Sequence, residues 1–275
     1  MKTRRDLVRL PVLSALLAGA LLAIGGAVAP AAQAQTFKFA NQGDALSMDP
    51  HSLNESFQLS FTGNIYEPLI GRGKKLELVP ALATDWKQTS PTVWRFNLRK
   101  NVQFHDGTPF TAEDVIFSYR RAQGDGSDVK TYVGAIKEIR KIDDHTIDIV
   151  TNEPFPILPD VVTNWYMMPK KWSEDNRATQ PVDKRKGVEN TASFKANGTG
   201  PYRLRSRDPN VRTTLQRNPG YWGKIEGNVQ EVVFTPIGNA STRVAALLSG
   251  EIDMMEPVPV QDVARIQASP NLKVM

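Results

Sequence analysis

The segment from Trp94 to Ala122 constrains the fold more than any other part of this sequence, because two different hydrophobic periodicities meet within it. Apolar and polar residues alternate over residues 94–98, and a period of two predicts a strand with one buried face. After a short interruption, Val115, Tyr119 and Ala122 recur at the spacing of one helix face. The segment therefore predicts a strand, a turn and a helix in direct succession.

The interruption at His105–Pro109 has the composition of a tight turn. Gly107 tolerates a positive φ and the proline fixes φ, so we expect the chain to reverse its direction here. Thr111 and Asp114 have the spacing of a capping box, in which each side chain accepts a hydrogen bond from the backbone of the other residue. The helix is therefore predicted to begin at Ala112.

The charge and the cysteine content exclude several classes of function. The net charge is +5, and the first 34 residues alone carry +3 of it. The remainder gives little support to a nucleic-acid-binding surface, which needs a clustered basic face. No cysteine occurs in the 275 residues, so the sequence excludes disulfides, thiolate metal sites and cysteine nucleophiles. We expect a soluble protein with no nucleic-acid partner.

Residues 1–34 have the pattern of an export signal. A basic start is followed by an apolar run from Leu10 to Val28 and by the small residues Ala32-Gln33-Ala34, which predict cleavage after Ala34. The alternative is a membrane anchor, but Gly25, Gly26 and Pro30 weaken this run as a spanning helix. The pattern leaves export by the general secretory or the twin-arginine route open, and it predicts a periplasmic protein.

The rest of the chain reads as a mixture of strands and short helices. A polar turn joins two strand-like runs into a predicted hairpin, residues 136–142 and 146–150. Near the end of the chain, a strand, a helix and a strand follow one another as in a βαβ unit, residues 229–235, 241–249 and 252–255. Earlier predicted elements are a first strand at 37–40, a helix from Glu55 that ends near 66–69, and strands at 202–206 and 213–217. These elements predict an α/β fold with a parallel or mixed sheet.

Several motifs resemble those of one known family. Residues 98–115 read L-R-K-N-V-Q-F-H-D-G-T-P-F-T-A-E-D-V, and shorter motifs are L-S-M-D-P-H at 46–51, G-T-G-P-Y at 198–202 and N-P-G-Y-W-G at 218–223. Together they resemble the family 5 extracellular solute-binding proteins, the periplasmic receptors of peptide-type ABC transporters. In that family, the segment around His105 and Asp106 builds structure and carries no chemistry, and the segment at 46–51 lies close to the ligand cleft. The glycines of G-T-G-P-Y permit a tight backbone crossing.

The resemblance implies an α/β lobe of the type II periplasmic-binding-protein kind. Its main domain is expected to comprise residues 35–80 and 195–275, and its mixed sheet is interrupted by an inserted α+β subdomain at residues 81–194. Family members are considerably longer, so the second lobe is expected to be missing from this chain. The groups that pair with peptide termini lie largely in that lobe, and none is assigned here. A fragment that does not bind ligand by itself is therefore an alternative to a working receptor.

Four residues are candidates for the ligand cleft. Asn54 and Glu55 lie where a loop meets a predicted helix, whose first amides and polar side chains are available to a ligand. Such residues also serve as helix caps. In the W-Y-M-M segment at 165–168, an exposed Trp165 or Tyr166 would suit a cleft that accepts variable side chains, while the other residues are expected in the core.

The resemblance predicts a receptor that binds di- or oligopeptides or a related small solute and delivers them to permease subunits in the inner membrane. The receptor is expected to be a monomer without enzymatic activity and without a cofactor. The family also serves nickel, so a nickel or metallophore receptor using His51 and its neighbours is an alternative. A secreted hydrolase is less well supported, because the sequence contains neither H-E-x-x-H nor G-x-S-x-G. Its candidate residues would be three histidines and the acidic residues beside them: His51, His105, His145, Asp49, Asp106 and Asp144.

Overall fold

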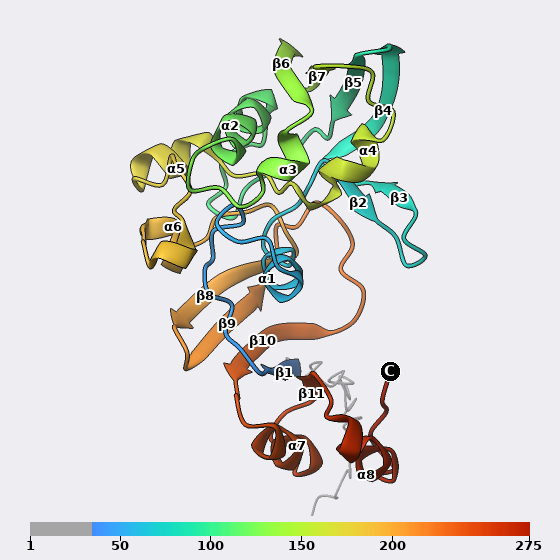
Figure 1. The fold of residues 1–275 in the computed structure, drawn as a ribbon, viewed down its shortest axis with the longest axis vertical. Helices are drawn as coiled ribbons and strands as arrows, with labels where there is room; N and C mark the ends of the chain where they lie inside the picture. The colour runs from blue at the N-terminus through green and yellow to red at the C-terminus, as the bar shows by residue number, and fades with distance from the viewer. Residues whose placement is uncertain (1–34) are drawn as a thin grey trace, which may run out of the picture. The chain divides into compact units, whose positions relative to one another are not determined.

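The computed structural model describes residues 35–275 (Figure 1). The predicted signal peptide, residues 1–34, lies outside this range. Within it, none of the helices combines the length and the apolar character that a membrane span requires.

A five-stranded mixed sheet forms the first layer of the fold (Figure 1). Its strands follow the order β11-β1-β10-β9-β8, with bounds β1 Gln35–Asn41, β8 Tyr202–Asp208, β9 Arg212–Arg217, β10 Val229–Pro236 and β11 Met254–Glu256. Strand β1 pairs in parallel with both β10 and β11, whereas β9 is antiparallel to β10 and to β8. Helix α7 (Ala240–Leu248) connects β10 to β11. The predicted βαβ unit is therefore confirmed, and β1 lies between its two strands.

A four-stranded antiparallel sheet lies at the other end of the ribbon in Figure 1. Its order is β4-β5-β7-β6, with bounds β4 Ala83–Ser90, β5 Val93–Leu98, β6 Ile136–Asp143 and β7 Thr146–Thr151. The predicted strand at 94–98 and the predicted hairpin are both confirmed. All four strands fall within the predicted insertion at 81–194, while the domain boundaries themselves stay a prediction. A separate two-stranded sheet joins β2 (Ile70–Arg72) to β3 (Leu78–Pro80).

Short helices occupy the connections between the strands. They are α3 Lys130–Val133, α4 Leu158–Val161, α5 Lys170–Asp175, α6 Thr191–Phe194 and α8 Val263–Gln267, with 3-10 turns at Val162–Asn164, Lys184–Lys186 and Val260–Asp262.

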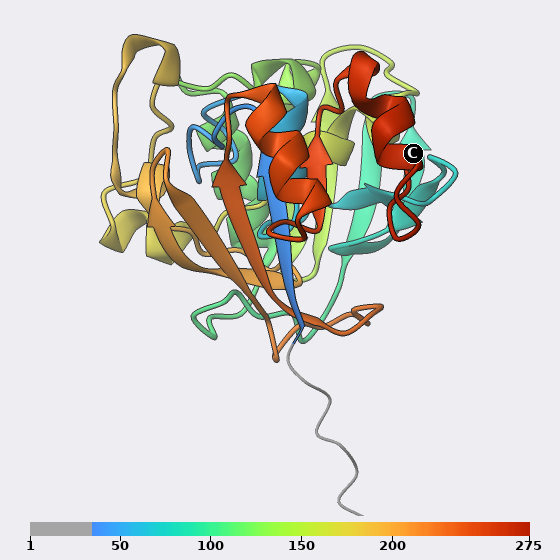
Figure 2. The same cartoon turned by 90° about the horizontal axis from the view of Figure 1, so that it is seen from below.

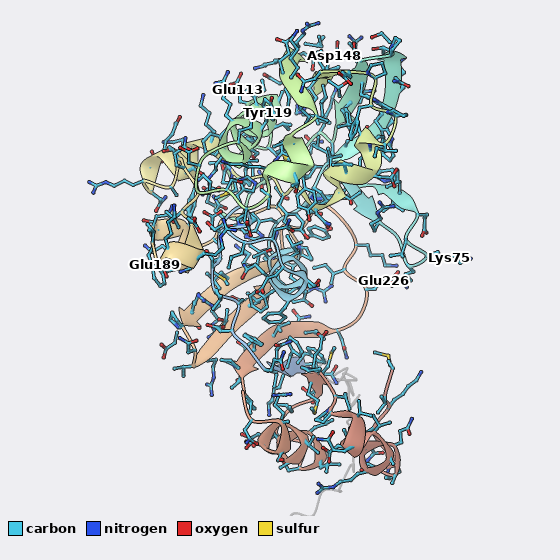
Figure 3. All side chains as sticks on the ribbon, viewed as in Figure 1. Lys75, Glu113, Tyr119, Asp148, Glu189 and Glu226 are labelled. Carbon is cyan, nitrogen blue, oxygen red and sulfur yellow. The ribbon has the colours of Figure 1, made fainter. Side chains whose placement is uncertain are left out.

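Helix α2 (Ala112–Ala122) begins where the capping box places it. The Thr111 side chain accepts from the backbone N–H of Glu113, and the Asp114 carboxylate accepts from the backbone N–H of Thr111 at 2.9 Å. The helix is amphipathic. Tyr119 points inward and donates through its hydroxyl to the carbonyl of Ile136 at 2.7 Å, whereas Glu113 lies outside (Figure 3).

Three apolar clusters form the core of the part of the chain that the structure describes. The first fills the space between the four-stranded sheet and α2, and the second lies between α1 (Ser56–Thr62) and one face of the five-stranded sheet. In the second cluster, the rings of Phe57 and Phe61 each lie 5.3 Å from the ring of Phe234 on β10. The third cluster packs α7 and α8 against Ala40 and Met255 of the same sheet (Figure 2). The five-stranded sheet is thus covered by helices on both faces.

Helix α1 is shorter than predicted. The apolar spacing predicted a helix that ends near residues 66–69, but the helix ends at Thr62. Beyond the helix, the carbonyl groups of Asn64 and Ile65 accept hydrogen bonds from the backbone N–H groups of Tyr202 at 3.0 Å and Gly200 at 2.9 Å. Pro68 has no backbone N–H and disfavours a helical conformation at the residue before it, so a helix could not continue through residues 66–69.

The G-T-G-P-Y segment makes this crossing, and its glycines are required there. A Cβ atom on Gly198 would lie 2.0 Å from the carbonyl oxygen of Ile65, and a Cβ on Gly200 would lie 2.7 Å from the carbonyl carbon of the same residue. Backbone therefore lies directly against backbone. The predicted tight crossing is confirmed.

His105 holds the crossing from the other side. Its backbone N–H donates to the carbonyl of Gly198 at 2.8 Å, its Nδ1 accepts from the N–H of Gly198 at 3.3 Å, and its Nε2 donates to the carbonyl of Gly200 at 3.0 Å. This pattern requires the neutral ring with its proton on Nε2. The neighbouring Asp106 accepts from the side-chain amide of Asn197 at 2.7 Å. Both residues therefore serve the structure, as the resemblance implied.

Replacing Gly198 with alanine is expected to lower the free energy of unfolding by at least about 2 kcal/mol, because the added methyl group meets fixed backbone rather than a movable side chain. Urea denaturation followed by tryptophan fluorescence measures the change. Gly43→Ala is the matched control, since nothing lies within 4 Å of its Cβ position. Equal stability of the two variants would contradict the role of the crossing.

Candidate functional site

The loop between β1 and α1, residues 42–55, carries the L-S-M-D-P-H motif and the candidate residue Asn54. Two buried ion pairs hold this loop. Near its start, Arg207 of β8 donates through Nη2 to Oδ2 of Asp44 at 3.3 Å. In its middle, Arg121 of α2 donates through both Nη atoms to the two carboxylate oxygens of Asp49, at 2.8 and 2.5 Å. The two ion pairs therefore attach the loop to β8 of the five-stranded sheet and to α2, which packs against the four-stranded sheet.

The Asp49 and Arg121 side chains are fully buried. Burial by itself would raise the pKa of Asp49, but the guanidinium of Arg121 lowers that pKa below its ordinary value, so the pair is ionised. The Nε of Arg121 donates to the carbonyl of Ala178 at 3.0 Å, which gives the guanidinium a third fixed partner.

His51 lies beside this pair and is also completely buried. Its backbone N–H donates to Asp49 at 2.9 Å, and its Nε2 lies 2.8 Å from the carbonyl oxygen of Tyr166. Burial and the nearby positive charge of Arg121 lower the pKa of His51 to about 4, so the ring is neutral.

The motif at 46–51 is therefore largely buried in this chain, and its position close to the ligand cleft stays a prediction. Asp49 and His51 have no exposed surface, whereas Leu46 is half exposed. The buried imidazole of His51 is engaged with Tyr166, which makes it a poor candidate ligand for nickel. Within residues 35–275, no group of three or more histidine and acidic side chains is arranged to hold a metal ion.

Asn54 and Glu55 lie at the end of the loop and are exposed. The side-chain oxygen of Asn54 accepts from the hydroxyl of Tyr132 at 2.7 Å, and its backbone N–H donates to Asp128 at 3.0 Å. Glu55 occupies the N-cap position of α1, but its side chain makes no capping hydrogen bond. Its carboxylate is thus available at the surface.

Tyr132 and Asp128 belong to α3 and the loop before it, so the inserted region contributes to this site. Sequence reasoning missed both residues. More than 70 positions separate them from Asn54, and no spacing within the chain signals a contact of that kind. Asp128 is further paired with Arg185 at 3.1 Å.

The prediction that Trp165 or Tyr166 is exposed is wrong. Trp165 is fully buried and Tyr166 is 8% exposed. The indole N–H of Trp165 donates to the carbonyl of Ser118 at 3.4 Å, and the hydroxyl of Tyr166 donates to the carbonyl of Leu59 at 3.1 Å. The segment lies between the first and the second apolar cluster. The indole N–H and the phenol hydroxyl both donate to backbone carbonyls, so these two amphipathic side chains can be buried as core residues.

A second buried polar group lies at the junction of the sheets. Glu67 accepts from the hydroxyl of Tyr221 at 2.9 Å and from the indole N–H of Trp222 at 2.8 Å. Burial raises the pKa of Glu67, while these donors act in the opposite direction. The guanidinium of Arg99 lies over the Trp222 ring, 4.0 Å from its centroid. These contacts fasten the N-P-G-Y-W-G segment.

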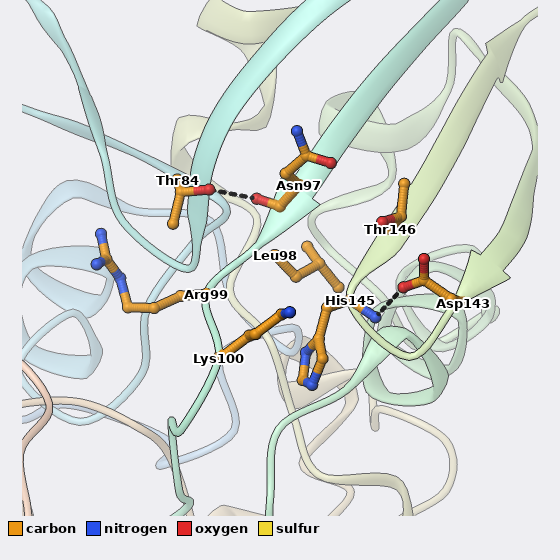
Figure 4. Close-up of a pocket in the computed structure, with 8 residues that line it drawn as sticks. All are labelled: Thr84, Asn97, Leu98, Arg99, Lys100, Asp143, His145 and Thr146. Atoms are coloured by element: carbon orange, nitrogen blue, oxygen red, sulfur yellow. Dashed lines mark hydrogen bonds between the residues drawn. The ribbon is translucent and has the colours of Figure 1, made fainter.

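A hollow of about 610 Å³, lined mostly by residues with polar side chains, lies at one end of the four-stranded sheet (Figure 4). Its floor includes the β6–β7 turn, where Asp143 accepts from the backbone N–H of His145 at 2.7 Å. Lys100 reaches into the hollow, whereas Arg99 is directed away from it (Figure 4). The lining mixes a carboxylate with an ammonium group and belongs to the inserted sheet, not to the loop that carries Asn54.

A family model described as bacterial extracellular solute-binding proteins, family 5 Middle, matches residues 77–275. The chain belongs to this family. It is 30% identical over 277 residues to the periplasmic oligopeptide-binding protein OppA of Escherichia coli (strain K12), a match that covers 92% of this chain and 49% of OppA. Identity to the periplasmic murein peptide-binding protein MppA of the same strain is 28% over 236 residues, covering 78% of this chain and 42% of MppA. The chain therefore spans about half the length of the curated relatives it matches.

Solved structures agree with this assignment. The ABC transporter-associated periplasmic binding protein DppA from Helicobacter pylori, in complex with the peptide STSA, superposes with a TM-score of 0.75 at 29% identity, over 86% of this chain and 49% of DppA. NikZ from Campylobacter jejuni, in complex with Ni(L-His), has a TM-score of 0.75 at 20% identity, over 86% of this chain and 46% of NikZ. The second likeness concerns the fold alone. The α/β lobe predicted from the family 5 resemblance is confirmed.

Stability is expected to fall as the pH is lowered from about 6.5 to about 4, because the pKa values of His51 and His105 are both lowered to about 4 in the folded protein. Below pH 6.5 the imidazoles of the unfolded chain take up protons while the folded rings stay neutral down to about pH 4, so protonation favours the unfolded state over this range. For His105 the loss amounts to up to about 3 kcal/mol.

The matched variant is His105→Gln, whose amide retains one donor and one acceptor but does not titrate. Urea denaturation of wild type and variant at several pH values isolates the histidine, since the other groups contribute equally to both proteins. The difference in unfolding free energy is expected to shrink toward pH 4. A difference that stays constant over this range would contradict the neutral, buried state of His105.

Proposed function

We propose that this chain is a lobe of a periplasmic receptor that captures di- or oligopeptides, or a related small solute, and presents them to the permease of an ABC transporter. The observation that carries the proposal is the likeness to DppA, because that structure was solved with a peptide and shares both the fold and 29% of the aligned residues. The peptide-binding names of OppA and MppA support the same assignment.

The exposed groups at the end of the β1–α1 loop are the proposed ligand contacts of this lobe. Asn54 offers a side-chain amide whose oxygen is oriented by Tyr132, and Glu55 offers a carboxylate that does not cap α1 and has no hydrogen-bond partner within residues 35–275. Both are hydrogen-bonding groups suited to the backbone amides or the ammonium end of a peptide. A binding role, not a catalytic one, follows from this set, because it contains no nucleophile with an adjacent base.

Capture is proposed to occur by closure of two lobes over the ligand, followed by docking of the closed form on permease subunits in the inner membrane. This chain supplies one lobe as a monomer, with a main domain at 35–80 and 195–275 and an inserted subdomain at 81–194. Export is proposed to remove residues 1–34, so that the protein acts in the periplasm.

Edman sequencing of the protein recovered from the periplasm is expected to begin at Gln35, because the A-x-A pattern ends at Ala34. The intact mass of the same sample is expected to show whether further residues follow in the cell. An N-terminus that retains residues 1–34 would contradict signal cleavage.

Asn54→Ala is expected to weaken the binding of the tetrapeptide STSA by roughly tenfold, because a hydrogen bond to a buried ligand group is lost. Isothermal titration calorimetry of the protein isolated from the periplasm measures the dissociation constant. Asn228→Ala is the matched control, since Asn228 is exposed and its side chain has no hydrogen-bond partner among the described residues. Equal losses in the two variants would contradict the assignment of Asn54.

A further inference from the structure

A continuous series of hydrogen bonds links the buried Asp49–Arg121 pair to the exposed candidate Asn54. Asp49 accepts from the backbone N–H of His51 at 2.9 Å, and the carbonyl of His51 accepts from the backbone N–H of Asp128 at 2.9 Å. The Asp128 carboxylate then accepts from the backbone N–H of Asn54 at 3.0 Å. The series starts at α2, passes through the loop, enters the inserted region and returns to the loop.

The first member of this series, the Asp49–Arg121 pair, has the largest number of hydrogen bonds to restrict its orientation. Arg121 holds both oxygens of Asp49 and also binds the carbonyl of Ala178, so the guanidinium fork has three fixed acceptors. Neither side chain has exposed surface, and a charge-assisted pair excluded from water is strongly directional. The carboxylate of Asp49 is thus held in one orientation.

A buried ion pair of this kind is expected to add little to the net stability of the fold, so stability does not explain why it is present. Removing two charges from water costs about as much as their attraction returns, and replacing both partners of a buried pair by neutral side chains is often nearly neutral. A role in placing the loop accounts for the pair better, because the hydrogen bonds that follow it end at Asn54.

We propose that Arg121 is a positioning residue for ligand recognition: through Asp49 it sets the placement of Asn54 and of its partners in the inserted region. The inserted subdomain then acts as part of the recognition apparatus and not only as a structural addition. This inference rests on the proposed function, since it assigns a purpose to the order of Asn54.

The loop contains its own matched control. The Asp44–Arg207 pair is nearly as buried, and its arginine also binds a backbone carbonyl, that of Ala45. Asp44 likewise accepts from a backbone N–H, that of Asn210, at 2.8 Å. The two pairs are similarly buried and both bind backbone groups, although Arg207 makes only one contact with its carboxylate. The Asp44 pair lies ten positions from Asn54 and outside the series that reaches it.

The experiment compares Asp49→Asn/Arg121→Met with Asp44→Asn/Arg207→Met. Asparagine keeps an acceptor for the backbone N–H and methionine keeps the aliphatic stem, so each double variant removes the two charges with little change in shape. Hydrogen exchange of the amide protons of Asn54 and Asp128, followed by NMR, reports the order of the site. STSA titrations and melting temperatures are recorded on the same samples.

We expect exchange at both amides to accelerate by about tenfold or more in the Asp49/Arg121 variant and to stay near the wild-type rate in the Asp44/Arg207 variant. The two melting temperatures are expected to agree within about 5 °C. Unchanged exchange at Asn54 in the first variant, or equal acceleration in both, would overturn the proposal.

Arg121→Lys provides a further measurement if either double variant does not fold. Lysine keeps the charge but lacks the planar fork, so we expect an intermediate acceleration at Asn54, and an unchanged rate would again overturn the proposal. Absence of STSA binding by the wild-type protein would contradict the proposed function alone, because the exchange rates decide the positioning independently of any ligand.

Discussion

The fold depends on a contact in which two backbones meet without room for a side chain. Gly198 and Gly200 pass against the carbonyl group of Ile65, and His105 bridges both glycines from the opposite side. Because a Cβ atom fits at neither glycine, the two backbone segments can approach to this distance only when both positions are glycine. The chain that leaves for the four-stranded sheet and the chain that returns from it are therefore fastened at the same place.

Buried polar groups gather around this junction and restrict its arrangement. Asp49 with Arg121 and Glu67 with Trp222 are removed from water and fully engaged, so their desolvation is offset by short hydrogen bonds. We interpret them as determinants of arrangement more than of net stability, because a misplaced loop would leave charges buried without partners. The cost of such a misplacement is several kcal/mol by the usual magnitude for an unpaired buried charge, about 3–5.

Sequence reasoning succeeded where structure is decided locally. The alternation at residues 94–98 and the capping box at Thr111 depend on neighbours within one turn or strand, and both appear as predicted. It failed where distant segments decide. The burial of Trp165 follows from its place between cores, and the contact of Tyr132 with Asn54 joins residues 78 positions apart. The periodicity of a sequence indicates which face of a helix or strand is apolar, but it does not indicate which distant segment packs against that face.

The candidate contacts also indicate how much of the binding energy one lobe supplies. Hydrogen bonds from Asn54 and Glu55 contribute about 0.5–1.5 kcal/mol each, or up to about 3 kcal/mol when the partner is charged. A micromolar dissociation constant requires about 8 kcal/mol. If Asn54 and Glu55 are ligand contacts, as proposed, two such side chains orient a ligand but do not account for an affinity of this size. The relatives that this chain matches are about twice its length. In the proposed role, the placement of Asn54 matters more than the energy of its own hydrogen bond, because binding groups act together only when the ligand is held in the right orientation.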